Sequence, residues 1–305
     1  MSEEPATPTL PSLAAVRSGE SAQGIPVARS RWPRRLAYAF LIGYAILMFT
    51  PFAWSLITSF KTLPDSVTLN IIPDPFTTDA YRYLFTELDP PLPRLFLNSA
   101  IIAGAVTLTN VVLGSIAGYA FARLHFRFRE VLFLLVLASL MIPDQLRLVP
   151  VYLILNTLGL TKGVAQYGGV ILVLAISATS IFLMRQYFLS IPREIEEAAR
   201  IDGAGYFSTF WRVMLPLAGP ALAAVAILQF QGTWNGYFWP YVILQDPNQY
   251  TVPVALSFFR LAGGFLTNWP PLMAMVVLAT IPILVLYLFF QRYFVEGIAA
   301  SGVKA

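Results

Sequence analysis

The chain is dominated by long stretches that contain no charged side chain, separated by shorter segments in which basic and acidic residues gather. A hydrocarbon core about 30 Å thick is crossed by about 20 helical residues, so uncharged apolar stretches are typical of transmembrane helices. Six such stretches occur, at residues 36–60, 95–122, 131–143 with the apolar chain that follows, 163–184, 213–245 and 261–291. The pattern predicts an all-α integral membrane protein with six transmembrane helices.

The third stretch, residues 131–143, is too short to cross a membrane alone, since it covers only about 20 Å at about 1.5 Å per residue. A polar segment with Asp144, Gln145 and Arg147 follows it, between two prolines. Prolines break or kink a helix, and polar groups at membrane depth face protein or a water-filled cavity. We expect a broken helix. Asp144, Gln145 and Arg147 are candidates for the outer mouth of a path, and a local Asp144–Arg147 pair that satisfies the kink is the favoured alternative.

The positive charges between the stretches predict the orientation of the chain. With a cytoplasmic N-terminus, 14 of the 20 Lys and Arg residues lie on the cytoplasmic side and 6 on the external side. Lys and Arg accumulate in cytoplasmic loops of membrane proteins. We therefore expect a multi-pass membrane protein with both termini in the cytoplasm. This bias also accounts for the isoelectric point near 9.3 without a nucleic-acid partner.

The same pattern divides the chain into four regions. Residues 1–33, rich in Ala, Ser, Pro and Glu, are expected to be a disordered cytoplasmic tail. Residues 34–95 hold the first span and an external loop, residues 96–293 hold a core of spans two to six, and residues 294–305 are expected to be a cytoplasmic tail.

Composition excludes several classes of protein. Hydrophobic residues make up 57% of the chain and charged residues 12%, against about 25% charged in soluble domains. There is no cysteine, which excludes disulfides, zinc–thiolate sites and iron–sulfur clusters. None of the three lysines, Lys61, Lys162 and Lys304, lies in the phosphate-binding pattern G-x-x-x-x-G-K-[ST]. We expect no catalytic residue, metal site or cofactor in this chain.

Residues 190–205 predict a short cytoplasmic helix between spans four and five. Ser190 suits an N-cap, Pro192 suits a first turn, and acidic residues follow at the helix N-terminus. Gly203 can end the helix in a left-handed conformation. The predicted helix covers about residues 192–202.

Small side chains mark one face of this helix. Ile195, Ala198 and Ala199 have the spacing i, i+3 and i+4, and small residues there permit close approach of another surface. A second short helix, about 206–214, is expected to end at Leu215-Pro216. The two helices would form a rigid knob beneath the membrane that transmits a push into the bundle; the alternative is a solvated amphipathic loop helix.

The segment resembles the EAA loop of bacterial ABC-importer permeases. The matching residues are Glu197-Ala198-Ala199, Gly203 and Val213-x-Leu215-Pro216; the family usually has Ile at the position of Val213. From about Leu97 onward the chain is also similar to the carbohydrate-uptake branch, which includes the smaller permease subunit of the maltose transporter. The residues that carry this similarity are Asn98-Ser99, Tyr119-Ala120-Phe121-Ala122-Arg123, Trp234-Asn235, Gln291-Arg292-Tyr293-Phe294-Val295-Glu296-Gly297 and Gly302-Val303-Lys304.

This resemblance implies a type I importer permease fold and a set of partners. The partners are a dimer of ATP-binding subunits, which supplies ATP and magnesium, a second homologous permease, membrane lipid and an external solute-binding protein. The residues implied to couple this chain to the ATP-binding subunit are Glu197, Ala198, Ala199, Arg200, Asp202, Gly203, Leu215 and Pro216.

Span five supplies the candidate substrate path. Gln231, Trp234 and Asn235 have the spacing i, i+3 and i+4, and amides with indoles suit a sugar; interhelical packing is the alternative. We expect a permease for a sugar or oligosaccharide. A glycerol-phosphate or polyol importer is the nearest alternative. A secondary transporter is a further one, although no internal repeat and no acid within spans one, two, four, five or six supports it.

Overall fold

The computed structural model describes residues 31–262 and 268–302, and side chains within 35–259 and 268–290. The chain forms two compact units, Met1–Thr50 and Pro51–Ala305, and each is described by itself. The first is described from the start of α1 (Arg31–Thr58). Within the described ranges all regular structure is helical, as the hydropathy pattern predicts.

Up to six membrane spans are present. Three helices are long and apolar enough to cross a membrane by themselves, within α1, α4 (Leu92–Arg123) and α15 (Trp269–Gly302). Three bent pairs pass the same test together: α5 (Arg129–Ser139) with α6 (Asp144–Thr157), α7 (Ala165–Leu174) with α8 (Ala178–Ser190), and Tyr206–Leu217 with α12 (Gly219–Trp234). If each pair is one span, the number is the six that the charge pattern predicts.

Short elements connect the spans. On the side reached by the end of α1 they are α2 (Leu63–Ser66), α3 (Asp79–Thr86), α13 (Phe238–Ile243), the 3₁₀ turn η2 (Pro247–Gln249) and α14 (Val252–Ala262). Between α8 and α12 lies α9 (Arg193–Ile201). It is followed by α10 (Tyr206–Thr209), the π-helical turn η1 (Phe210–Met214) and α11 (Leu215–Leu217), which make up the segment Tyr206–Leu217 of the third bent pair.

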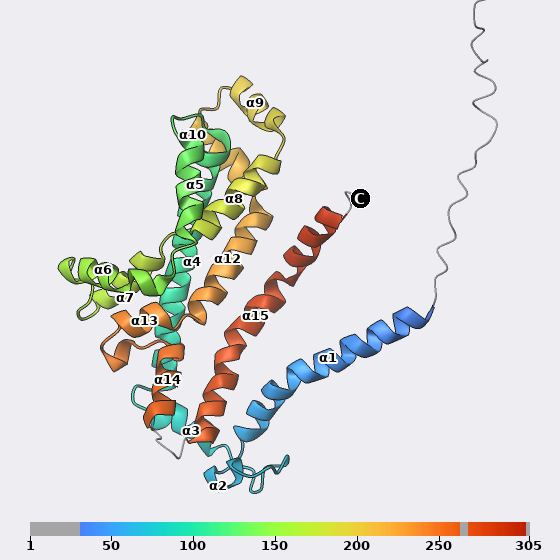
Figure 1. The fold of residues 1–305 in the computed structure, drawn as a ribbon, viewed down its shortest axis with the longest axis vertical. Helices are drawn as coiled ribbons and strands as arrows, with labels where there is room; N and C mark the ends of the chain where they lie inside the picture. Colours follow the sequence, from blue (N-terminus) through green and yellow to red (C-terminus); the bar gives the residue numbers. More distant parts are fainter. Residues whose placement is uncertain (1–30, 263–267, 303–305) are drawn as a thin grey trace, which may run out of the picture. The chain divides into compact units, whose positions relative to one another are not determined.

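Helix α4 is the centre of the second unit and contacts α8 and α12 along its length (Figure 1). Glycine permits the close approach of α8. A Cβ atom on Gly118 would lie 2.6 Å from Met184 Cβ, and one on Gly114 would lie 2.9 Å from Ser180 Cβ. Small residues four apart are a common device for bringing membrane helices together.

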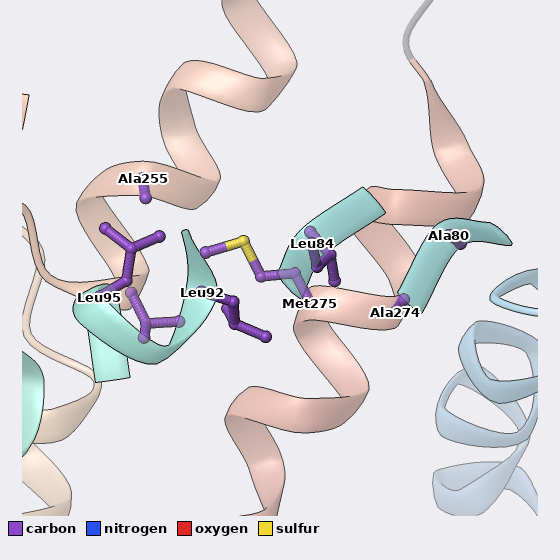
Figure 2. Close-up of a cluster of buried hydrophobic side chains, with 8 residues drawn as sticks. Ala80, Leu84, Leu92, Leu95, Ala255, Ala274 and Met275 are labelled. Carbon is purple, nitrogen blue, oxygen red and sulfur yellow. The ribbon is translucent and has the colours of Figure 1, made fainter. Parts of the chain in front are cut away.

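A cluster of buried apolar side chains joins α3, α4, α14 and α15 at one end of the second unit. Figure 2 shows Met275 of α15 extending toward Leu92 and Leu95 of α4, with Leu84 of α3 and Ala255 of α14 beside them. All five side chains are buried. The cluster fixes the start of α4 against the C-terminal helix.

The third span is broken, as its composition predicts. Helices α5 and α6 meet at 102°, with the break between Ser139 and Asp144. Pro143 is the N-cap of α6, whereas Pro150 lies inside that helix. The first proline therefore marks the break and the second does not end the helix.

A polar network supports the bend of 47° between α7 and α8. The Asn110 amide of α4 donates to the carbonyl oxygen of Leu174 at 2.7 Å, and its oxygen accepts from the backbone N–H of Ser177 at 2.8 Å. Gln229 of α12 donates to the hydroxyls of Ser177 and Ser180, both at 3.0 Å. Neighbouring helices thus satisfy the backbone groups that the bend releases, as a membrane interior requires.

The two predicted terminal tails are described only in part by the structure. Helix α15 continues to Gly302, so residues 294–302 of the predicted C-terminal tail are helical. The predicted tail of residues 1–33 lies outside the described residues except for its last three, which begin α1.

Candidate coupling element and membrane cavity

The predicted short helix is present as α9 and ends at Gly203. Gly203 has φ = 85°, the left-handed conformation expected of it. Its N–H donates to the carbonyl of Arg200 at 3.0 Å, and the N–H of Ala204 donates to the carbonyl of Ala199 at 2.9 Å. This pair of bonds is a Schellman motif. A residue with a Cβ is strained at Gly203, so the sharp exit of the chain from α9 depends on glycine.

The start of α9 differs from the prediction. Ser190 is the last residue of α8, and its hydroxyl donates to the carbonyl of Tyr187 at 2.7 Å. Pro192 is the N-cap of α9 and supplies no side-chain bond. The expected capping role of Ser190 is therefore wrong, because the last turn of α8 already uses its hydroxyl.

Most of the predicted coupling residues lie on the open surface of this region. Arg200 stacks over the ring of Tyr206 at 4.8 Å, and Asp202 is the C-cap of α9. Ala199 and Leu215 are partly buried. The exposed members of the predicted set are Glu197, Ala198, Arg200, Asp202, Gly203 and Pro216.

A buried ion pair attaches α9 to the bundle. Arg123, at the C-terminal end of α4, lies 3.5 Å from a carboxylate oxygen of Glu196, and only 4% and 7% of the two side chains are exposed. The same guanidinium donates to the carbonyl oxygens of Phe188, at 2.6 Å, and Ile191 at the end of α8. One arginine therefore joins α4, α8 and α9. The sequence singles out Arg123 only as part of a family motif, and nothing in it distinguishes Glu196 from the neighbouring glutamates.

The predicted second short helix is present and begins at Tyr206, as predicted. It runs through α10, η1 and α11 to Leu217, one residue beyond the predicted end at Leu215-Pro216. Proline in an α-helix clashes with the carbonyl four residues earlier. The π-helical turn Phe210–Met214 widens the helix just before Pro216, which lets the segment continue.

Large apolar side chains are exposed beside the predicted coupling residues. Ile201 is 86% exposed, Phe207 77% and Tyr206 60%. Exposed apolar groups of this size gathered next to an amphipathic helix mark an interaction surface. We call Ile201, Tyr206 and Phe207, together with Glu197 and Ala198, the coupling surface.

A cavity of about 560 Å³ lies among the broken third span, the bend of span four and the end of span five. Polar groups line it on three sides: Asp144 and Arg147, which form an ion pair, Ser177, Gln229, Thr233 and Tyr237. Trp239 also lines it, and its indole N–H has no hydrogen-bond partner within the described part of the chain. The cavity offers hydrogen-bond donors and acceptors in an apolar frame.

The structure places the predicted path residues in different environments. Asp144 lines the cavity, whereas Gln145, Gln231 and Asn235 are exposed outside its lining. Trp234 is buried, and its indole N–H donates to the carbonyl of Ala279 at 3.0 Å. Gln231, Trp234 and Asn235 therefore do not share one surface, because Trp234 packs against α15.

The lining residues outside the predicted set include the polar residues Ser177, Gln229, Thr233 and Tyr237. Gln229 is one turn before Thr233 on α12, so a face chosen two residues earlier would have included both. Ser177 enters the cavity only because of the bend in span four. The sequence shows that bend only as a polar stretch within an apolar span.

The Asn98-Ser99 motif holds the connection that precedes α14. The Asn98 amide donates to the carbonyls of Asn248 and Tyr250, both at 2.9 Å. The Ser99 hydroxyl accepts the N–H of Val252 at 2.9 Å. These bonds fix residues 248–252 to the start of α4.

A bundle of apolar helices with a polar cavity and an amphipathic helix outside its spans defines a membrane transport protein. The profile of the family described as binding-protein-dependent transport system inner membrane component matches residues 110–299. The chain belongs to this family.

Individual relatives agree with the family. The arabinooligosaccharide transport system permease protein of Halalkalibacterium halodurans is 36% identical over 276 residues, which are 88% of this chain and 97% of the relative. The sn-glycerol-3-phosphate transport system permease protein of Yersinia pestis bv. Antiqua is 36% identical over 211 residues, 69% of this chain and 74% of the relative.

The fold is also similar to a solved structure. The crystal structure of a bacterial ABC transporter involved in the import of the acidic polysaccharide alginate contains a chain with 26% sequence identity and a TM-score of 0.75. The match covers 88% of this chain and 98% of that chain. The protein is therefore a permease subunit with the fold of an ABC importer permease.

Proposed function

We propose that this permease forms part of the path for a neutral sugar or oligosaccharide and is driven by ATP hydrolysis in a separate subunit. The coupling surface is the observation that supports ATP-driven coupling. It is an exposed apolar and charged patch on α9 and the start of α10. The buried Arg123–Glu196 pair attaches α9 to the spans. A surface held in this way transmits displacement into the bundle. The complete transporter would contain a second homologous permease, two ATP-binding subunits and an external binding protein.

The cavity supports a neutral substrate. Its arginine, Arg147, is paired with Asp144, so no free positive charge is left there for a phosphate group. The other polar side chains of the lining carry hydroxyl, amide and indole groups, and such groups exchange hydrogen bonds with sugar hydroxyls. A relative named for an arabinooligosaccharide favours a neutral sugar. The similar solved transporter is named for an acidic polysaccharide, so it favours a carbohydrate without favouring a neutral one.

A glycerol-phosphate substrate is the second candidate, because one relative is named for sn-glycerol 3-phosphate. Such a substrate needs a cation in the path. Asp144→Asn separates the two candidates, since it frees Arg147: uptake of a neutral sugar should fall or stay level, whereas uptake of a phosphorylated substrate should rise.

The first experiment tests coupling. The tagged chain is extracted in mild detergent from cells that express its whole operon, as wild type, Gly203→Asp and Gly205→Ala. Gly205 has an ordinary negative φ of −73° and open space around it, so its variant is the matched control. We expect an ATPase to copurify with the wild type and the control, and to be lost or uncoupled from transport in Gly203→Asp.

Another outcome would remove the proposal. A wild-type chain that purifies alone and moves solute into vesicles without ATP would be a secondary transporter. The solute-binding protein that copurifies with an intact complex is then screened against neutral oligosaccharides and glycerol 3-phosphate to identify the substrate class.

A further inference from the structure

The chain that follows α1 closes into a fixed loop. The N–H of Thr77 donates to the carbonyl of Phe60 at 2.9 Å, and the Lys61 ammonium donates to the carbonyl of Asn70. Phe76 stacks on Phe60 with ring centroids 4.9 Å apart. Residues 61–77 therefore return to the point where they leave α1, and their middle part is held close to the end of that helix.

Two charged side chains of this loop, Lys61 and Asp65, are buried. Asp65 is buried and accepts hydrogen bonds from Thr68 at 3.1 Å, from the amide of Asn70 at 3.3 Å and from the N–H of Asp74 at 3.2 Å. The ammonium of Lys61 lies 3.9 Å away. Burial by itself raises the pKa of Asp65. The hydrogen bonds and the charge of Lys61 lower the pKa by more than burial raises it, so the net shift is downward and the carboxylate is ionised at neutral pH.

The apolar side chains of the same loop point outward. Leu69 is 91% exposed, Ile72 is 80% exposed, and Val67 and Ile71 are exposed as well. We call these four residues the apolar tip. No charged residue occurs between Asp65 and Asp74. The loop therefore buries its Lys61–Asp65 pair and exposes hydrocarbon between Asp65 and the exposed Asp74, which is unusual for a loop that faces water.

We propose that the apolar tip lies in the headgroup and upper acyl region of the lipid leaflet that the C-terminal end of α1 reaches. The residues from Arg35 to Thr58 of α1 form a candidate membrane span, and the closed loop keeps the tip beside the end of that span. The Lys61 ammonium lies 5.2 Å from the ring centre of Trp54, and tryptophan is enriched where a span meets the headgroups.

A lipid surface explains the exposed tip better than a soluble partner does. A binding protein that docks and leaves would return four large apolar side chains to water in every cycle, and exposed patches of this kind promote aggregation. Protein interfaces of that kind also carry a polar rim, whereas residues 66–73 present no charge. Lipid covers the tip continuously. This inference goes beyond the proposed function and does not depend on it.

The absence of native cysteine makes the proposal directly testable. Leu69→Cys, Ile72→Cys and Thr78→Cys are each labelled with a nitroxide in the full transporter with cysteine-free partners, in vesicles of phosphatidylethanolamine and phosphatidylglycerol. Thr78 is exposed, its side chain makes no capping bond, and it lies just past the loop. Collisions with oxygen report lipid, and collisions with a water-soluble nickel chelate report water.

We expect the oxygen-to-nickel accessibility ratio to be several-fold higher at residues 69 and 72 than at residue 78, and to be unchanged by saturating solute-binding protein. Equal ratios at all three positions would place the tip in water and overturn the proposal. Protection at residues 69 and 72 only after the binding protein is added would assign the tip to that protein instead. Protection from both reagents in its absence would place the tip against another subunit, and would also contradict the lipid contact.

Discussion

At the scale of single residues, the Arg123–Glu196 pair is the contact that attaches α9 to the bundle. Both side chains are buried, 3.5 Å separates their charged groups, and two backbone carbonyls accept hydrogen bonds from the arginine. A buried ion pair adds little net stability by itself, but removing one partner leaves the other charge without compensation. Loss of Glu196 would therefore disturb the attachment of α9 more than loss of any exposed glutamate on the same helix.

This difference gives a prediction for Glu196→Leu. We expect it to lower the free energy of unfolding in detergent by about 3–5 kcal/mol, because the Arg123 guanidinium stays buried without its partner. The matched control is Glu194→Leu at an exposed position of α9, with an expected change below about 1 kcal/mol. Chemical denaturation of the two purified variants measures both values. Equal losses would mean that the pair does not hold α9.

The sequence predicts some of these residue roles and not others. Gly203 was predictable because a left-handed helix end is a local property of a few neighbouring residues. Glu196 was not, because its burial depends on Arg123, which is distant in the chain. Trp234 was misplaced for the same kind of reason: helical spacing puts it beside Asn235, but the carbonyl of Ala279 on another helix determines where its indole points.

At the scale of elements, the contact between α4 and α8 is set by two glycines four residues apart. Gly118→Ala should lower the free energy of unfolding by about 1–3 kcal/mol, because a methyl group there overlaps the Met184 side chain and the α8 backbone. Gly104→Ala, in the same helix with open space around it, is the control. It should be neutral or slightly stabilising. The thermal unfolding midpoints of the two variants, measured in one detergent, test this prediction. Equal midpoints would contradict close packing of α4 against α8 at Gly118.

The helices themselves could largely be predicted, whereas their bends could be predicted only where the cause is local. Uncharged stretches predict six spans because the cost of burying charge in lipid is independent of the rest of the fold. The break at Pro143 has a local cause and was predicted. The bend near Ser177 depends on Asn110 and Gln229 from two other helices, and local sequence carries no information about them.

At the scale of the whole molecule, the positive-charge bias predicts which face of the bundle meets the ATPase. Glu194→Cys on α9 should react with a membrane-impermeant maleimide in inside-out vesicles and not in spheroplasts, and Thr78→Cys should do the opposite. The reason is that 14 of 20 basic residues lie on the α9 side of the predicted topology. The reversed labelling pattern would invert the chain and place the coupling surface outside the cell.

Helix α4 has a consequence for communication between the two faces. Its first turns are bonded to residues 248–252 through Asn98 and Ser99, and its last turn is bonded to α9 through Arg123. The 32 residues of α4 cover about 48 Å at about 1.5 Å per residue. One continuous helix therefore connects the contact with residues 248–252 to the contact with α9. Free-energy linkage between two sites is reciprocal. Suppose that a partner bound at residues 248–252 favours one position of α9. A second partner that binds α9 in that position must then strengthen binding at residues 248–252 by the same factor.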